Sequence, residues 1–448
     1  MDKKVRILIL SSLICLAVAV IGVVFYYGVL EDVFLQVPDY HGDILYKYSE
    51  TVDFEKLYSG QNEIEFVATR YSALYKIQNS MRQMYVSSMP LRNAANNTYS
   101  FISTNIENKD DYYVTENTDY DIEYRDNSVF IGNKKNWVRL NIPDVQSFSY
   151  GDCVSSVYKI DKAVRYTLND ESEVCFSPSY NGVVVTGVIN EGTESVSFPI
   201  KFADYKVNNN YYGGIALTDR DSDADDIMAN NRFIISMPII SSHNNSEISQ
   251  TKASIKNGEL ICSLPKDISY PATYTFTVNY YCENMFFDCA AVKQIPNTNH
   301  IFDSYIIYDS ANSENSICNY MKFNIRSFTP KRSKNLDQIL LNLYVLHCEG
   351  EVEIEVYAVR HDWCSWELTW NNQPNHNEKI GEFKVDKSGW YSIDLTEYTK
   401  RLIDRNYYKL ENNSIMFKVK DTSTGNAIFT STDNSVYPPF FEVNYRNG

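Results

Sequence analysis

The sequence is poor in the groups that most enzymes use for catalysis. Six histidines are scattered among its 448 residues. The Gly-x-Ser-x-Gly pattern of a serine nucleophile and the His-Glu-x-x-His pattern of a zinc peptidase are both missing. His361 lies beside Asp362, but such a pair at a strand end more often makes a local contact than a catalytic base. These absences predict a protein that is not an enzyme.

Positive charge is also scarce. The chain has 41 lysines and arginines against 57 aspartates and glutamates, a net charge of −16 at pH 7. No basic patch offsets this excess, so the chain repels the phosphates of nucleic acids and anionic membrane surfaces. No nucleic-acid partner is expected.

Cysteines are too few for a small disulfide scaffold. Eight of the nine follow residue 30, and none belongs to a Cys-x-x-Cys pair. An even number in an exported chain permits disulfide bonds, although eight cysteines allow many connectivities. The pairing is therefore left open, and a zinc site is not expected.

One acidic run is a candidate for binding a metal ion. Aspartates occupy alternate positions in it: Asp219, Asp221, Asp223 and Asp225. Carboxylates with this spacing can converge on Ca²⁺, as in the first half of an EF-hand loop. That loop also needs glycine at its sixth position and glutamate at its twelfth, where this chain has Ala224 and Asn230. A solvated acidic turn is the simpler interpretation, so no cofactor is expected and calcium is the one candidate.

A long apolar run, Ile7 to Leu30, lies near the N-terminus. It is long enough to cross a bilayer as a helix. Lys3, Lys4 and Arg6 precede the run, which predicts a cytoplasmic N-terminus and an extracellular remainder. A cleaved signal peptide is the alternative, with a small-residue site at Ala17-Val18-Ala19. Cleavage there would leave an apolar tail, so a single-pass anchor in the cell membrane is favoured.

Beyond the apolar run, the sequence pattern is that of β-strands. Apolar residues alternate with others from Ile339 to Leu346 and from Val352 to Val359, the period of strands with one buried face. Glutamates at alternate positions are most simply the solvated face of one strand: Glu349, Glu351, Glu353 and Glu355. Residues Ala68 to Met84 fit either strands or one helix. Further strands are predicted at Trp137–Ile142, Gly182–Ile189, Val196–Phe202, Ile415–Val419, Ala427–Thr430 and Phe440–Tyr445.

Four of the five tryptophans lie between Trp363 and Trp390, within the most specific part of the sequence. The motif residues there are Trp363, Thr369, Trp370, Asn371, Asn372, Pro374, Trp390 and Asp394. Together with the flanking strands, this region resembles the DNRLRE domain from about Phe302 to Arg446. The resemblance implies a jelly-roll-like β-sandwich of a secreted or surface protein, of a family in which some members bind acidic polysaccharides as carbohydrate-binding modules. Ser365 departs from the family, which usually has an acidic residue there, whereas Asp433 keeps a charge where the family often has glutamate.

The middle of the chain is similar to β-rich segments of wall-associated and Rhs-type surface proteins. The similarity rests on Gly214–Asp219, Phe233–Ile239 and Tyr270–Tyr274, taken in that order. It implies an exported scaffold without catalytic activity.

These observations predict an all-β protein in which an N-terminal transmembrane helix precedes β-sandwich domains, the last of them jelly-roll-like. Its predicted parts are residues 1–30, a cytoplasmic stub and anchor; residues 31–145, a connector and β-rich region; residues 146–297, a β-sandwich-like domain; and residues 298–448, the DNRLRE-like sandwich.

The predicted function is to bind a cell-wall or environmental polysaccharide outside the cell. Large rings anchor sandwich interiors, so Trp363, Trp370 and Trp390 are expected in the core. Trp366, which is outside the motif, and Tyr391 are the candidates for stacking on a sugar. One alternative is a structural or adhesive protein that contacts other surface proteins, and a third hypothesis is a polysaccharide-degrading enzyme.

Overall fold

The computed structural model describes residues 46–49, 52, 69–77, 80–92, 101–116, 120–154, 159–211, 214–220, 231–242, 248–266, 268–282, 284–309, 316–359, 362–406 and 413–446. The chain divides into two compact units, Met1–Gly42 and Asp43–Gly448, and all the described residues belong to the second. Within these ranges nearly all regular structure is β-strand, and the one α-helix is α4 (Thr396–Asn406). The predicted all-β class is confirmed.

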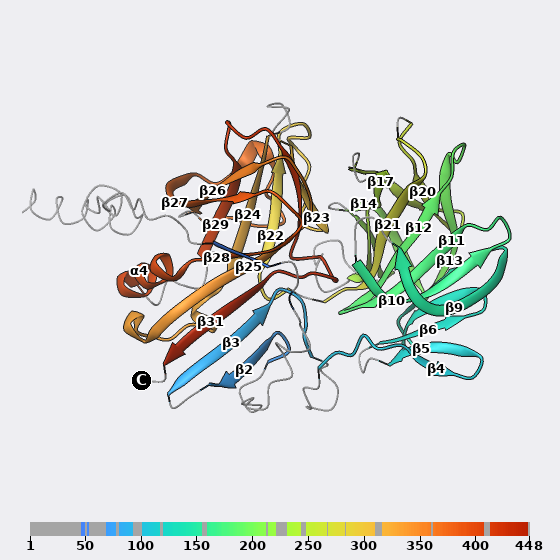
Figure 1. The fold of residues 1–448 in the computed structure, drawn as a ribbon, viewed down its shortest axis with the longest axis horizontal. Coiled ribbons are helices and arrows are strands. Elements are labelled where there is room, and N and C mark those ends of the chain that lie inside the picture. The colour runs from blue at the N-terminus through green and yellow to red at the C-terminus, as the bar shows by residue number, and fades with distance from the viewer. Residues whose placement is uncertain are drawn as a thin grey trace, which may run out of the picture. The chain divides into compact units, whose positions relative to one another are not determined.

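Two antiparallel sheets form a sandwich that contains the tryptophan-rich region. The larger sheet has the order β1 (Tyr46–Ser49), β28 (Gly389–Asp394), β25 (Leu336–Glu349), β31 (Phe440–Arg446), β3 (Met81–Ser87) and β2 (Ser72–Lys76), with β30 (Asn426–Thr430) and β23 (Tyr305–Asp309) attached through β25. The five-stranded sheet has the order β22 (Phe287–Val292), β24 (Ile317–Phe323), β29 (Asn413–Val419), β26 (Val352–Val359) and β27 (His376–Val385). Figure 1 shows both sheets, with β2 and β3 (blue) extending the larger one beside β31 (dark red).

The core of this sandwich follows from the alternation seen in the sequence. Val352, Ile354 and Val356 of β26 are fully buried and pack in one cluster with Leu341 and Val443 of the larger sheet. The residues between them on β26 are only partly buried, so one face of the five-stranded sheet is turned away from the core. The strands predicted near 340, 355, 415, 428 and 442 are therefore confirmed.

The middle of the chain forms two further antiparallel sheets that share a second core. The ten-stranded sheet consists of β14 (Tyr205–Tyr211), β15 (Gly214–Asp219), β16 (Asn231–Ser236), β21 (Ala272–Tyr280), β12 (Gly182–Ile189), β11 (Glu173–Ser179), β10 (Lys159–Leu168) and β9 (Val145–Val154), with β17 (Ile239–Ser242) and β18 (Ile248–Gln250) attached. The other consists of β19 (Ala253–Lys256), β20 (Glu259–Ser263), β13 (Ser195–Phe202), β8 (Trp137–Asn141), β7 (Ser128–Gly132), β6 (Asp121–Arg125), β5 (Tyr112–Glu116) and β4 (Glu107–Lys109). Val185 and Phe276 of the first sheet pack with Leu140 and Ile200 of the second.

Several strands pair with partners far away in the sequence. The segment Ala68 to Met84, which fits either strands or a helix, contains β2 and the start of β3, and β3 pairs with β31. Likewise, β22 pairs with β24, and β8 pairs with β13. These sheets join segments that the division at residues 146 and 298 separates, and that division stays a prediction.

One disulfide bond joins Cys153 of β9 to Cys175 of β11. The Cα atoms of the two cysteines are 6.2 Å apart, within the range that a disulfide spans. A disulfide was one of the outcomes that the cysteine count left open, and the structure assigns the pair.

In the part of the chain that the structure describes, no helix has both the length and the apolar composition needed to cross a membrane. The predicted anchor, Ile7 to Leu30, lies outside the described residues, and it stays a prediction.

A fragment of residues 298–448 should fail to fold into a stable, soluble unit. It lacks β22 and β3, so β24 and β31 would expose unpaired edges, and the core would lose Val86 and Phe286. We expect this fragment to aggregate or to unfold without a cooperative transition, as judged by light scattering and thermal denaturation. A fragment that starts at residue 43 keeps every described strand and is the control. A 298–448 fragment that unfolds cooperatively at the same temperature as this control would contradict the prediction.

Candidate functional site

The tryptophan loop, residues 362–375, covers part of the outer face of the five-stranded sheet. The Trp363 ring meets Tyr320 of β24 edge to face, with ring centroids 5.8 Å apart. Its Nε1 donates a hydrogen bond to Ser414 Oγ of β29 at 2.9 Å. Met321, next to Tyr320, belongs to the sandwich core, so Tyr320 and the loop lie on the opposite side of the sheet. Trp363 is 8% exposed and therefore buried as predicted, but outside the sandwich interior.

The polar motif residues hold the tryptophan loop in its fold. Asn372 Oδ1 accepts a hydrogen bond from Thr369 N at 2.6 Å, and Asn372 Nδ2 donates to Glu367 O at 2.6 Å. Asn371 Nδ2 donates to Asn297 Oδ1 at 2.8 Å, which ties this loop to the segment before β23. The hydrogen bonds of Asn372 therefore lie within the loop, and that of Asn371 joins the loop to the neighbouring segment.

A buried asparagine completes the attachment of the loop. Asn299 Nδ2 donates to Ser365 O at 2.7 Å and to Leu368 O at 2.8 Å. At the other end of the motif, Tyr320 Oη donates to Gln373 Oε1 at 3.0 Å and lies 3.5 Å from Pro374 O. The motif predicted from sequence is thus a structural one that fixes the loop on the sheet.

Two of the three tryptophans in the tryptophan loop keep part of their surface exposed. Trp366 is partly buried, and its ring meets Phe302 edge to face with centroids 5.2 Å apart. Trp370 begins a 3₁₀ turn, Trp370–Asn372, and is also partly buried. The prediction that it lies in the sandwich core is therefore wrong. Sugar stacking by Trp366 remains a prediction.

Trp390 and Tyr391 lie on opposite sides of β28. Trp390 is 2% exposed and packs against Tyr344 and Phe440 in a cluster separate from the sandwich core, so its predicted burial is confirmed but not its place in the interior. Tyr391 is 1% exposed and belongs to that core. No ligand can stack on a ring in that position, so the predicted sugar contact of Tyr391 is wrong. Asp394, at the end of β28, accepts a hydrogen bond from Thr396 N at 2.8 Å and thereby orders the start of α4.

Next to the tryptophan loop, the same outer face carries a set of charged side chains, here called the charged face. Its members come from β26, β27, the end of β29 and the turns beside them: Glu351, Glu353, Glu355, Tyr357, Lys379, Glu382, Lys384, Lys418, Lys420 and Asp421. The strand register places Glu353 opposite Lys384 and Glu355 opposite Lys418. It also places Glu355 opposite Glu382, and Lys379 lies close enough to pair with both carboxylates.

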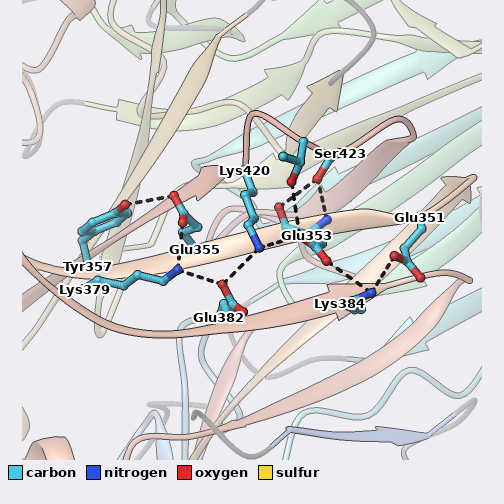
Figure 2. Close-up of polar contacts among 10 residues, drawn as sticks. Glu351, Glu353, Glu355, Tyr357, Lys379, Glu382, Lys384, Lys420 and Ser423 are labelled. Carbon is cyan, nitrogen blue, oxygen red and sulfur yellow. Dashed lines mark hydrogen bonds and ion pairs between the residues drawn. The ribbon is translucent and has the colours of Figure 1, made fainter. Parts of the chain in front are cut away.

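Three lysines of the charged face each bridge two carboxylates (Figure 2). The ion pairs, given as Nζ–O distances, are Lys379–Glu355 (2.8 Å), Lys379–Glu382 (2.7 Å), Lys384–Glu351 (2.7 Å), Lys384–Glu353 (3.2 Å), Lys420–Glu353 (2.8 Å) and Lys420–Glu382 (3.6 Å). Because the bridges share Glu353 and Glu382, they form one continuous network rather than isolated pairs. Sequence reasoning took the glutamates for a solvated face and did not identify these lysines. The spacing of Glu382 and Lys384, two residues apart in one strand, was a signal for one of them.

The network keeps its members charged at neutral pH. Hydrogen bonds from Lys420 and Lys384 lower the pKa of Glu353, and a hydrogen bond from Lys379 lowers the pKa of Glu382. Burial opposes the shift at Glu355, yet hydrogen bonds from Lys379 and Tyr357 leave its pKa lowered as well. These carboxyls therefore do not hold a proton that they could transfer, and the face is suited to hydrogen bonding.

Tyr357 connects the charged face to the tryptophan loop. Its Oη donates to Glu355 Oε2 at 2.9 Å, while its ring packs with the cluster that contains Trp363 and Trp366. The ring is only partly buried. It therefore offers an apolar surface beside fixed hydrogen-bond donors and acceptors, the combination found in sites for hydroxyl-rich ligands.

Three further carboxylates lie in or near β22: Asp288 and Asp303 are buried, and Asp433 is partly buried. Asp288 is 2% exposed, accepts hydrogen bonds from Thr432 N at 2.9 Å and from Asn319 Nδ2 at 3.2 Å, and has a third bond from Thr432 Oγ1. Burial raises the pKa of Asp288 to about 6. Burial also raises the pKa of Asp303, which contacts His300 Nδ1 at 2.7 Å, and the pKa of Asp433.

No set of three or more His, Cys, Asp or Glu side chains is arranged to hold a metal ion within the described ranges. Of the aspartates predicted as calcium ligands, Asp219 forms an ion pair with Arg232. Asp221, Asp223 and Asp225 lie outside the described residues, so calcium binding there stays a prediction.

Residues 290–445 match the family model of carbohydrate-binding module family 96. This match supports carbohydrate binding by the C-terminal sandwich, and the finer resemblance to the DNRLRE domain stays a prediction. The whole charged face and the tryptophan loop lie inside the matched range. No curated protein matches the chain.

Distant similarity is found to solved structures, among them three proteins of different kinds. They are a rhamnosidase from Novosphingobium sp. PP1Y (8% identity, 66% of this chain and 25% of that one, TM-score 0.17), the N-terminal domain of a Streptococcus gordonii adhesin (8%, 84% and 91%, 0.16) and a GH31 alpha-xylosidase from Xanthomonas citri (7%, 87% and 38%, 0.11). The chain thus spans about a quarter of the length of the rhamnosidase. With TM-scores this low, the similarities carry no argument about fold or function.

Replacing Asp288 with asparagine should make folding stability less dependent on pH. The pKa of Asp288 is raised in the folded state, so its contribution to stability is fully present below its unfolded pKa of 3.8 and is lost as the pH rises through about 6. Relative to the unmodified protein, the variant should gain up to about 3 kcal/mol of unfolding free energy between pH 4 and pH 7. Asn319 can turn its amide, whose Oδ1 has no partner in the described structure, to accept a hydrogen bond from the new Nδ2.

Urea unfolding at several pH values measures this effect. The exposed Asp421 on the charged face, changed to asparagine, is the control and should not reproduce the trend. If the free energies of unfolding of the Asp288→Asn variant and the unmodified protein differed by the same amount at every pH, Asp288 would not titrate as described.

Proposed function

We propose that the protein binds polysaccharide through the charged face and does not transform it. The observation that carries the proposal is the coincidence of two findings: the match to a carbohydrate-binding module covers residues 290–445, and the charged face is an exposed, ordered set of hydrogen-bonding groups within that range.

The chemistry of the face suits a sugar chain. A hydroxyl group both donates and accepts hydrogen bonds, and here ammonium donors and carboxylate acceptors lie side by side on neighbouring strands. Because the ion pairs hold Lys379 and Lys420 in place, less side-chain freedom is lost when a ligand binds. The partly buried ring of Tyr357 can pack against the apolar side of a pyranose.

The pKa shifts on the face support binding rather than hydrolysis. A glycosidase needs one carboxyl that holds a proton near neutral pH. The carboxyls of Glu353, Glu355 and Glu382 have lowered pKa values. The carboxyl with a pKa raised to about 6, Asp288, is buried, where no polymer can reach it.

We place the protein at the cell surface. The apolar run from Ile7 to Leu30 is long enough for a membrane anchor, with the remainder of the chain extracellular. The disulfide between Cys153 and Cys175 supports an oxidising environment for the folded part, as expected outside the cytoplasm.

Substituting alanine for Tyr357 should weaken polysaccharide binding about tenfold, or about 1.4 kcal/mol, because the stacking surface is lost. Binding of the full-length protein to a panel of polysaccharides is measured by affinity electrophoresis or by sedimentation with insoluble polymers. Tyr357→Phe keeps the ring and should retain most of the affinity.

The matched control is Tyr150→Ala, which removes an exposed tyrosine from β9, outside the matched region. It should leave binding unchanged, and the thermal midpoints of the variants exclude unfolding as a cause. Trp366→Ala tests whether the ring in the tryptophan loop also contacts the sugar. The proposal fails if no polysaccharide is retained, or if Tyr357→Ala binds as well as Tyr150→Ala does.

A further inference from the structure

The charges of the charged face nearly cancel. Its carboxylates are Glu351, Glu353, Glu355, Glu382 and Asp421, and its lysines are Lys379, Lys384, Lys418 and Lys420, so five negative charges meet four positive ones. The whole chain carries a net charge of −16 at pH 7. A polyanion that approaches this surface is therefore not attracted by the field of the protein.

Three of the four lysines also have little electrostatic attraction left for a ligand, whereas the one ion pair of Lys418 in the described structure is with Asp421, at 3.8 Å. The Nζ of Lys379 already lies 2.8 Å from Glu355 and 2.7 Å from Glu382, and the same double contact recurs at Lys384 and Lys420. A carboxylate on the ligand could pair with one of these ammonium groups only beside the two carboxylates already there, or by displacing one of them. Both arrangements bring like charges close together, which is unfavourable.

A hydroxyl group meets no such obstacle. An ammonium group has three N–H donors, so a lysine that donates to two carboxylates can still donate to one hydroxyl. Each carboxylate has lone pairs left, and those of Glu353 and Glu382 can accept from a hydroxyl while remaining paired with lysine. Vicinal hydroxyls of one sugar can thus bridge neighbouring members of the network without any ion pair being broken.

We infer that the charged face selects an uncharged, hydroxyl-rich polysaccharide and discriminates against glycans that carry uronate or sulfate groups. This inference rests on the proposed function and specifies its ligand class. It differs from what the resemblance to DNRLRE domains implies, which is an acidic polysaccharide.

The variant Glu382→Gln gives opposite results for the two ligand classes. Glu382 contacts both Lys379 and Lys420, so removal of its charge leaves these two lysines with fewer carboxylate partners and makes the face net neutral. A neutral glycan loses a strong acceptor and should bind up to about tenfold more weakly. An acidic glycan gains two less saturated cations and should bind more tightly.

The experiment compares full-length protein and variant on neutral polymers (β-glucan, mannan, xylan) and acidic ones (polygalacturonate, polymannuronate), each at low and high ionic strength. The matched control is Glu397→Gln on α4, where a glutamate of similar exposure pairs with Lys400 at 2.9 Å, away from the charged face. It should change neither binding series. Thermal midpoints show whether each variant is folded.

The expected result is retention by a neutral polymer with little dependence on salt, weakened by Glu382→Gln and not by Glu397→Gln. Tight, salt-sensitive binding of the unmodified protein to an acidic polymer, in preference to the neutral ones, would overturn the inference while leaving polysaccharide binding intact. Binding to none of the polymers would instead contradict the proposed function itself.

Discussion

One face of strand β26 packs in the hydrophobic core, and its other face carries charged side chains on the outer surface. The arrangement of the C-terminal sandwich depends on this division. The pleat of β26 directs Val352, Ile354 and Val356 into the core and places Glu353 and Glu355 on the outer face. A slip of one residue would bury glutamates and expose valines, so the apolar packing fixes the register. That register in turn determines which lysine meets which glutamate outside. The hydrophobic core therefore positions the ionic network, although the two lie on opposite faces of the five-stranded sheet.

The strands were largely predictable because their information is local. Alternation in Val352–Val359 and the β-branched run of Gly182–Ile189 indicate strands without knowledge of their partners, and both are strands in the structure. Pairing is not local in this way. Nothing near Met81 indicates that it pairs with Arg446, and the segment Ala68 to Met84 fits a helix equally well in isolation.

The candidate site shows the same limit. The clustered tryptophans indicate burial, but they do not indicate on which side of which sheet, and Trp363 and Trp390 lie outside the sandwich interior. Trp390 and Tyr391 differ by one position along the chain, which reverses the direction of the side chain, so the predicted sugar contact of Tyr391 depended on an unknown register. To predict the charged face, one would have to know which lysines pair with Glu353 and Glu355. These lysines come from β27 and from the end of β29.

The pairing of β3 with β31 has a consequence for folding during synthesis. Residues 81–87 leave the ribosome long before residues 440–446, yet each strand is the other's neighbour in the finished sheet. During synthesis, the hairpin of β2 and β3 has one edge unpaired until β31 is made. Products of interrupted synthesis therefore lack a closed sandwich and are exposed to proteolysis or chaperone capture. Only chains that have been synthesised as far as β31 can form the complete larger sheet.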